Sequence, residues 1–344
     1  MARILVTGGA GFIGSNFVYH LLREEPDASV VVLDKLTYAG NLENLQPLRD
    51  DPRLQFVRGD IADPDTVRDV IRGCDIVYNF AAESHVDRSI QDAHDVVWTN
   101  VRGTQVLLDA VRELAIPRYV QVSTDEVYGS RASGAFTESD ALQPSNPYSA
   151  CKAAGDLLVL AYVRTWKLPA LVTRSSNNYG PYQHPEKLIP LHITNAMETK
   201  PLPIYGDGSN VRDWLHVEDN CRAIHLVGRQ GVEGEIYNIA GHSERSNLWI
   251  VERIVELTRC DPRLKRFVQD RPGHDFRYAI LDEKVRALGY QPRWSLEEGL
   301  KQTVSWYRAH EGWWQRIKGG EFADYYRGQY EGRDAEHSEP GGTE

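Results

Sequence analysis

Short runs of β-branched and other apolar residues recur through the first half of the chain, with helical spacing between them. The runs lie at residues 4–7, 30–33, 54–57, 76–80, 119–122 and 170–173. Apolar positions repeat with a helical period at residues 12–23, 65–71 and 101–114, and Pro147 begins a further helix-forming segment that extends to Trp166. This alternation predicts an α/β fold, in which helices cover both faces of a doubly wound parallel sheet of the Rossmann type.

The pattern changes after about Tyr179, where Pro and Gly interrupt shorter segments that contain scattered aromatic residues. Helices are still predicted at 248–257 and 296–307, and a strand at 236–239 could return to the main sheet. We therefore predict a main domain over residues 1–180, joined by residues 215–245, and a smaller C-terminal lobe over residues 181–327. Few apolar residues follow, so residues 328–344 are predicted to form a disordered tail.

Three glycines, Gly8, Gly11 and Gly14, follow the first predicted strand and open the first predicted helix. Gly8 allows a tight turn, and Gly14 allows the helix to pack closely against the strand. Gly11 lets the backbone approach a pyrophosphate at the helix N-terminus. A glycine motif between a strand and a helix predicts a dinucleotide-binding site, so the main domain is expected to bind the cofactor and the smaller lobe the substrate.

Asp34 ends the second predicted strand, about twenty residues after the glycine motif. Its carboxylate can accept hydrogen bonds from an adenosine ribose and would repel a 2′-phosphate, which favours NAD over NADP. Asp60, Ala81 and Ala82 follow the third and fourth predicted strands and are placed to line the adenine and ribose pocket. The alternative interpretation is that Asp34 only caps a turn. Lys35 beside it could weaken the preference for NAD over NADP.

Tyr148 and Lys152 are separated by four positions, so both side chains lie on one face of the predicted helix. A tyrosine is a poor base at neutral pH, because its unperturbed pKa is about 10. A neighbouring ammonium, together with the positively charged nicotinamide ring, favours the phenolate. Tyr148 could then accept a proton from a substrate hydroxyl while hydride leaves the same carbon; a surface pair without chemistry is the alternative.

Thr124, Asp125 and Glu126 end the fifth predicted strand, at the edge where open α/β sheets bind ligands. The Thr124 hydroxyl could assist the tyrosine. Two adjacent carboxylates at this place are unusual, because charged groups avoid sheet interiors. They offer the acid and the base that elimination of water requires, with pKa values that different surroundings can push apart. Two solvated turn carboxylates are the alternative interpretation.

The second half of the chain contains candidate ligands for a phosphorylated substrate. Arg212 and Arg271 could make bidentate contacts to a diphosphate, and Lys187 could make a single-point contact. The alternative is that each arginine is only a surface residue, which is the more common case. Arg271 belongs to a predicted turn, where binding residues are often found.

Composition narrows the class of protein. The formal net charge of −10 argues against nucleic-acid binding, which needs a basic surface. The chain has no run of about 18 apolar residues, so no membrane span is predicted. The N-terminus lacks the basic and apolar regions of a signal peptide. The cysteines, at positions 74, 151, 221 and 260, are too widely spaced to indicate a disulfide framework or a zinc site. We expect a cytoplasmic protein with free thiols and no metal.

Together with these residues, the wider sequence resembles the extended short-chain dehydrogenases, and within them the dTDP-glucose 4,6-dehydratases. The resemblance extends from about Arg3 to Tyr307, and it is carried by residues 34–41, 81–89, 123–129, 176–182, 185–190, 212–214 and 270–275. Related epimerases and decarboxylases share the glycine motif and the Tyr/Lys pair. They usually lack the Asp125–Glu126 pair, which is therefore the discriminating feature.

The resemblance implies roles for the matching residues. Asp125 would protonate the departing C6 hydroxyl, and Glu126 would remove the C5 proton. Tyr148, helped by Lys152 and Thr124, would deprotonate the C4 hydroxyl. NAD would contact Phe12, Ile13, Asp34, Lys35, Thr37, Asp60, Ile61, Ala81, Ser84 and Thr99. The nucleoside-diphosphate-glucose would contact Ser84, Thr124, Asn177, Lys187, Leu188, Pro203, Ile204, Tyr205, Arg212, Asn247, Arg271 and His274.

Some positions depart from the pattern of the family. Cys151, Ala154 and Gly155 stand where the family often has serines. None of them carries chemistry in this interpretation, so the departure concerns helix packing and leaves the predicted activity unchanged. Family likeness also implies a homodimer.

The predicted reaction is redox-neutral and converts dTDP-glucose into dTDP-4-keto-6-deoxyglucose. C4 is oxidised by NAD, water is eliminated across C5 and C6, and hydride returns to C6. One alternative is a C4 epimerase on the same scaffold, against which the Asp125–Glu126 pair argues. Another is a non-catalytic NAD-sensing protein, against which the Tyr148–Lys152 pair argues. The sequence leaves open whether the base is thymine or uracil and which deoxysugar pathway uses the product.

Overall fold

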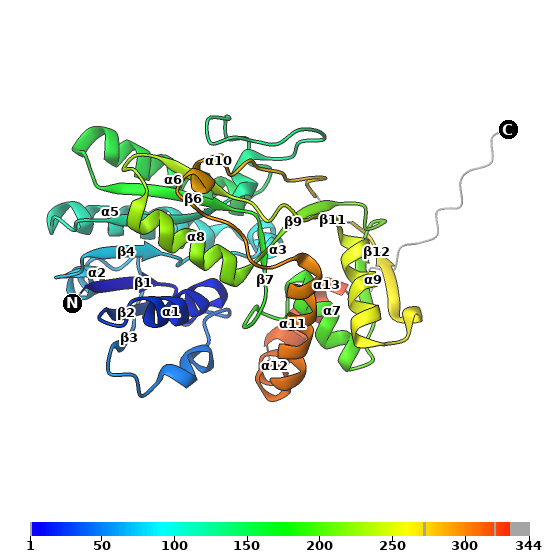
Figure 1. The fold of residues 1–344 in the computed structure, drawn as a ribbon. Helices are drawn as coiled ribbons and strands as arrows, with labels where there is room; N and C mark the ends of the chain where they lie inside the picture. The colour runs from blue at the N-terminus through cyan, green and yellow to red at the C-terminus, as the bar shows by residue number, and fades with distance from the viewer. Residues whose placement is uncertain (1, 271–272, 320, 331–344) are drawn as a thin grey trace.

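A seven-stranded parallel sheet forms the centre of the computed structural model, which describes residues 2–270, 273–319 and 321–330 (Figure 1). Two strands lie on one side of β1 and four on the other, so the strand order reverses beside β1. Ligands bind at such a switch point in open α/β sheets. The spatial order is β10 (Ile236–Ile239), β6 (Ala170–Ser175), β5 (Tyr119–Thr124), β4 (Ile76–Asn79), β1 (Arg3–Thr7), β2 (Ser29–Asp34) and β3 (Leu54–Arg58). The predicted doubly wound sheet is therefore confirmed, including the return of residues 236–239.

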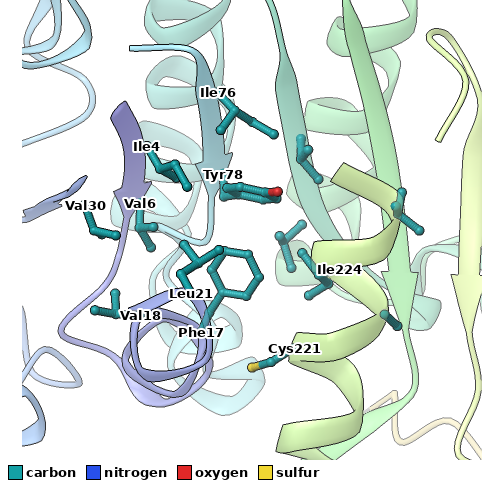
Figure 2. Close-up of a cluster of buried hydrophobic side chains, with 14 of the residues drawn as sticks. Ile4, Val6, Phe17, Val18, Leu21, Val30, Ile76, Tyr78, Cys221 and Ile224 are labelled. Atoms are coloured by element: carbon teal, nitrogen blue, oxygen red, sulfur yellow. The ribbon is translucent and has the colours of Figure 1, made fainter. Parts of the chain in front are cut away.

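Helices cover both faces of this sheet because each has one apolar side. One face is covered by α1 (Phe12–Glu24) and α8 (Val217–Gln230). Figure 2 shows Phe17 and Leu21 of α1, with Ile224 of α8, against strand residues such as Tyr78. The other face is covered by α2 (Pro64–Ile71), α5 (Thr104–Glu113) and α6 (Pro147–Trp166). The helix predicted at 101–114 forms in two parts, since a π-helical turn, η2 (Trp98–Gly103), leads into α5.

Helix α6 begins with a capping box. The backbone N–H of Ser149 donates to Asn146 Oδ1 at 2.9 Å, and the Ser149 hydroxyl accepts from the Asn146 backbone N–H at 3.3 Å. Pro147 occupies the first turn, where its missing N–H costs nothing. This local structure fixes where the helix starts, and so places Tyr148 in its first turn and Lys152 one turn later.

The C-terminal lobe lies beyond one end of the sheet (Figure 1). It contains a three-stranded sheet of β11 (Glu244–Ser246), β9 (Val211–His216) and β7 (Asn177–Tyr179), and the pair β12 (Lys265–Val268) and β8 (Leu202–Tyr205). Its helices include α7 (Leu188–Met197), α9 (Asn247–Thr258), α11 (Leu296–Ala309), α12 (Glu311–Lys318) and α13 (Glu321–Tyr330). Ile193, Ile250, Leu300 and Trp314 come from four of these helices and share one core.

The structure of the lobe confirms two predicted helices and corrects the start of the predicted tail. Helices α9 and α11 confirm the segments predicted at 248–257 and 296–307. The disordered tail was predicted to start at residue 328, but residues 328–330 complete α13. The start of the predicted tail was wrong because α13 packs its aromatic residues against the lobe, which composition alone does not reveal. Residues 331–344 lie outside the described part of the chain, and the predicted domain boundaries remain a prediction.

Three negative findings concern the part of the chain that the structure describes. None of its helices combines the length and apolar character that a bilayer span requires. Its His, Cys, Asp and Glu residues form no group of three or more that could hold a metal ion. The four cysteines are free, and Cys74, Cys151 and Cys221 are buried.

Candidate active site

The glycine turn between β1 and α1 is shaped to receive a ligand. Gly8 has φ of +68°, and a Cβ there would lie 2.6 Å from the Ala81 backbone nitrogen. A Cβ at Gly14 would lie 2.2 Å from the Gly8 carbonyl oxygen, so both positions exclude larger residues. Around Gly11 there is more room, since its nearest neighbour would be the Gly8 carbonyl oxygen at 3.3 Å. The space left at the N-terminus of α1 suits a pyrophosphate.

A pocket extends from this turn along the carboxyl ends of the strands. Every residue that the sequence predicted for the cofactor lines it: Gly8, Gly11, Phe12, Ile13, Gly14, Asp34, Lys35, Thr37, Asp60, Ile61, Ala81, Ala82, Ser84, Thr99, Tyr148 and Lys152. We call it the cofactor pocket. The strand ends that supply these residues lie next to one another only because the sheet is parallel.

Asp34 is held rigidly in the wall of the cofactor pocket. It is 8% exposed, and its carboxylate accepts hydrogen bonds from the backbone N–H groups of Ala10 at 2.9 Å and Leu36 at 2.8 Å. Burial raises the pKa of Asp34, and these hydrogen bonds oppose the rise. Lys35 Nζ pairs with the Asp60 carboxylate at 2.9 Å. The cation next to Asp34 is therefore already matched by an anion.

Tyr148 and Lys152 lie on the same face of α6, both at least nine-tenths buried. Lys152 Nζ donates to the Val122 carbonyl at 2.6 Å. Burial lowers the pKa of Lys152 to about 8, and the Asp156 carboxylate opposes this change. The Thr124 side chain lies close enough to Tyr148 to act on the pKa of its phenol.

The direction of the Tyr148 pKa differs from the one predicted. The sequence predicted that a neighbouring ammonium would favour the phenolate. In the structure, burial raises the pKa of Tyr148, the charges of Glu126 and Asp125 raise it further, and the Thr124 hydrogen bond opposes them. Burial, followed by the charges of Glu126 and Asp125, thus disfavours the phenolate in the protein alone.

The segment after β5 forms a short 3₁₀ helix, η3 (Asp125–Tyr128), capped by the Thr124 hydroxyl, which accepts from the Glu126 backbone N–H at 3.3 Å. Asp125 is 2% exposed, and its Oδ2 has no hydrogen-bond partner within the described chain. Burial raises the pKa of Asp125 well above its usual range, and nearby Glu126 and Asp213 raise it further. This shift favours the protonated form of Asp125, the form that a proton donor needs.

A second pocket adjoins the first and shares Ser84, Glu186 and Lys187 with it. We call it the substrate pocket. Glu126 faces it from η3. Most residues predicted for the substrate line it: Ser84, Asn177, Lys187, Leu188, Pro203, Ile204, Tyr205, Arg212, Asn247 and His274. Thr124 lines neither pocket but lies next to Tyr148, which lines the cofactor pocket. Arg271 lies outside the described residues.

The predicted diphosphate ligands differ in their surroundings. Lys187 Nζ donates to the Ser84 carbonyl at 2.8 Å, which places the ammonium at the junction of the two pockets. Arg212 is 5% exposed and donates to the carbonyl oxygens of Val211 at 2.8 Å and Asp275 at 2.9 Å. Its guanidinium also makes a cation–π contact, at 4.4 Å from the Tyr278 ring centroid. Arg212 is thus embedded in the pocket wall and has fewer N–H groups to offer a ligand than the sequence suggested.

Sequence reasoning missed one buried acid. Glu186 lines both pockets, with a fully buried side chain that lies 3.6 Å from His85 and from Arg88. Burial raises the pKa of Glu186 to about 7, and the cations Lys187 and Arg88 oppose the rise. Its stretch, 185–190, contributed to the family resemblance, but nothing in the local sequence shows that a carboxylate there is buried. The other residues of the pocket wall that were not predicted include Glu83, His85, Asp87, His184, Tyr278 and Tyr330.

Comparisons with known proteins agree with this geometry. Residues 5–303 match a family model described as GDP-mannose 4,6 dehydratase. The chain is 55% identical over 304 residues to the low-salt glycan biosynthesis protein Agl12 of Haloferax volcanii, with 88% of this chain and 98% of that protein covered. It is 53% identical to a dTDP-glucose 4,6-dehydratase of Streptomyces niveus, with 92% and 96% covered. Among solved structures, DesIV, a dTDP-glucose 4,6-dehydratase of Streptomyces venezuelae with NAD bound, matches with a TM-score of 0.90 and 52% identity, over 92% of this chain and 100% of that one.

Proposed function

This chain belongs to the GDP-mannose 4,6-dehydratase family, and from that membership and the site geometry we propose that it is a nucleotide-sugar 4,6-dehydratase. It converts dTDP-glucose into dTDP-4-keto-6-deoxyglucose, and its cofactor is NAD. The observation that carries the proposal is the placement of Asp125 and Glu126 directly after β5 and near Tyr148, with Glu126 in the wall of the substrate pocket. A C4 epimerase would have no use for a second acid and base at this place.

The cofactor pocket fits NAD. The cradle at Gly11 would hold the pyrophosphate, and Asp34, fixed in the wall, would bind the adenosine ribose. Tyr148 and Lys152 line the same pocket at the end nearest the substrate. When bound, NAD supplies the redox chemistry: it takes hydride from C4 of the sugar and returns it to C6.

Tyr148 is the proposed base for the C4 hydroxyl. Its phenol is buried, and the interaction with Thr124 lowers its pKa, against burial and the charges of Glu126 and Asp125. Thr124 would therefore help Tyr148 to hold negative charge while the proton of the C4 hydroxyl is transferred. Lys152, fixed to the Val122 carbonyl, would present its ammonium to the same end of the pocket.

Glu126 and Asp125 are the proposed pair for loss of water. Once C4 is a ketone, the C5 hydrogen becomes acidic, and Glu126 faces the pocket from which it can remove that proton. Asp125, whose pKa is raised by burial and by nearby Glu126, would give a proton to the C6 hydroxyl as the C6–O bond breaks. Water leaves, hydride returns to C6, and Glu126 returns its proton to C5. The proton that Tyr148 took from the C4 hydroxyl then replaces, through solvent, the one that Asp125 gave up. The net change is loss of one water, with no change in the oxidation state of the cofactor.

We also propose that the enzyme works as a homodimer in the cytoplasm. Support for the dimer comes from large exposed apolar side chains on neighbouring elements: Ile90 of α3 (Val86–Gln91), Val97 of α4 (His94–Val97), Trp98 and Leu157. Such a group of apolar residues on one surface is typical of a protein interface. Support for the compartment comes from the four free thiols, which a reducing environment preserves.

Isotope labelling tests the proposed reaction. With dTDP-glucose deuterated at C4, the label should appear at C6 of the product, because hydride leaves and returns within one pair of adjoining pockets. In deuterated water, solvent deuterium should appear at C5, because the proton on the Glu126 carboxylate exchanges with solvent. Mass spectrometry and NMR of the product measure both positions.

The same experiment separates the dehydratase from its nearest rival. An epimerase would return the label to C4 and release no water. Loss of the C4 label to solvent would contradict the proposed reaction, since hydride held between the two pockets does not exchange with water.

A further inference from the structure

A chain of buried polar side chains connects the two elements that carry the proposed acid and base groups. Arg174 of β6 is 1% exposed, and its Nε donates to the Asp156 carboxylate of α6 at 2.9 Å. Nη1 of the same guanidinium donates at 2.8 Å to the hydroxyl of Tyr128, the last residue of η3. The Tyr128 hydroxyl donates in turn to Asn238 Oδ1 of β10 at 2.9 Å. Arg174 therefore contacts α6 with one N–H group and η3 with another.

On α6, the contact lies one turn beyond Lys152. Tyr148, Lys152 and Asp156 follow one another at intervals of four residues, so they lie on one face of the helix. All three side chains are buried. Burial lowers the pKa of Lys152, and the Asp156 carboxylate opposes this change. The ion pair with Arg174 thus holds the face of α6 that reaches the cofactor pocket.

On η3, the contact lies at the end of a single turn. Glu126 stands two positions before Tyr128 in this turn. The Tyr128 ring stacks on the Phe136 ring at a centroid distance of 5.2 Å, and the Arg174 guanidinium lies 4.8 Å from its centroid. A turn of 3₁₀ helix this short has few hydrogen bonds of its own. Its orientation therefore depends on the contacts at its two ends, the cap from Thr124 and the Tyr128 hydroxyl.

The polar character of this chain indicates positioning more than stability. A buried ion pair loses the hydration of both charges, and apolar side chains of similar volume often stabilise a core equally well. Hydrogen bonds differ from apolar contacts because they have a preferred length and direction. Tyr128, Asp156 and Arg174 line neither the cofactor pocket nor the substrate pocket, so they can act on the reaction only through residues that do.

We propose that Arg174, together with Asp156 and Tyr128, is a positioning residue that holds α6 and η3 in register. The register matters because the proposed base for oxidation lies on α6, whereas the proposed acid and base for elimination lie on η3, and both elements must face the same sugar. This inference rests on the proposed function, which assigns the two steps to these elements.

Tyr128→Phe tests the contact to η3. It removes one hydroxyl and leaves the pair of Arg174 and Asp156 in place. Reduced cofactor should form at the parent rate when dTDP-glucose is added, because α6 is undisturbed. Its reoxidation should slow by about ten- to a hundredfold, since a small displacement of a catalytic group can cost that much. Absorbance in a single turnover measures both rates, and the Kd for dTDP should not change.

Arg174→Lys should give the same result as Tyr128→Phe. An ammonium can pair with Asp156, but it lacks the second N–H group that the planar guanidinium directs at Tyr128. Because both substitutions break one contact, the double variant should be no slower than the slower single variant. Losses that multiply in the double variant would overturn the inference, because the two side chains would then act independently.

Asp156→Asn tests the contact to α6. Formation of reduced cofactor should itself slow by about tenfold, so that little of it accumulates, and Asp156→Glu, which keeps the charge, should restore most of the rate. A merely structural role would lower the melting temperature without slowing this step. Formation of reduced cofactor at the parent rate in folded Asp156→Asn would therefore contradict the inference.

Tyr119→Phe is the matched control. Tyr119 is fully buried at the start of β5, at the opposite end of the strand from η3. Its hydroxyl donates to Gln121 and accepts from Asn79 Nδ2 at 3.1 Å. The variant should lose stability and keep the parent lifetime of the reduced cofactor. A parent-like lifetime in Tyr128→Phe, or an equally long one in Tyr119→Phe, would overturn the inference. A parent protein that does not dehydrate dTDP-glucose would instead contradict the proposed function.

Discussion

Replacing Tyr148 by phenylalanine should lower kcat by about 10²–10⁴-fold, the usual contribution of a positioned acid–base group. That loss corresponds to roughly 3–5 kcal/mol of barrier. The physical reason is that the C4 hydroxyl proton then has no acceptor, while the buried ring and its packing against Cys151 and Val96 are retained. Steady-state turnover of dTDP-glucose and the protein's affinity for NAD should be measured together, and the affinity should remain within a few-fold of the parent value.

A matched control lies on the same helix. Tyr162 is also buried, and its hydroxyl donates to Asp109 Oδ1 at 2.8 Å, far along α6 from either pocket. Tyr162→Phe makes the same chemical change and should cost only stability, by about 1 kcal/mol for one hydrogen bond. If Tyr148→Phe turned over within threefold of the parent, Tyr148 would have no part in the mechanism.

Replacing Glu126 by glutamine should separate oxidation from elimination. The C4 hydroxyl can still lose its proton to Tyr148, but the C5 proton then has no base, so overall turnover should fall by about 10²–10⁴-fold. Reduced cofactor should accumulate when substrate is added, and its absorbance in a single turnover measures the block directly.

The Glu126→Gln change also removes a negative charge that raises the pKa of Tyr148. The pH at which oxidation reaches half its maximum should therefore move down, because Tyr148 loses its proton more easily.

Asp140→Asn is the control for loss of a carboxylate. Asp140 lies in the segment between η3 and α6. Its carboxylate accepts a hydrogen bond from the Thr137 backbone N–H at 2.7 Å and pairs with Arg131 at 3.0 Å. It lines neither the cofactor pocket nor the substrate pocket, so its loss should leave turnover unchanged. Dehydration at the parent rate in Glu126→Gln would show that another group removes the C5 proton.

The sequence by itself determined the parallel sheet and predicted where along it the candidate site residues lie. The alternation of apolar runs and helical periods gave the parallel sheet, because strands buried on both faces need continuous apolar residues. The glycine motif, Asp34, Thr124 and Tyr148 were each found at the end of a strand or the start of a helix, and local spacing is enough to identify such positions. All the residues predicted for the cofactor line one pocket for this reason.

Only the tertiary structure decided the electrostatics and the outer wall of the site. Whether Glu186 is solvated or buried, and in which direction the pKa of Tyr148 moves, depends on groups that the fold brings together from distant parts of the chain. The same holds for Tyr330, which composition assigned to a tail and which packing against Tyr205 places in the substrate pocket. A sequence pattern reports local periodicity, whereas burial and charge–charge distances arise from contacts between residues far apart in the chain, and these fix the pKa values and the shape of the pocket.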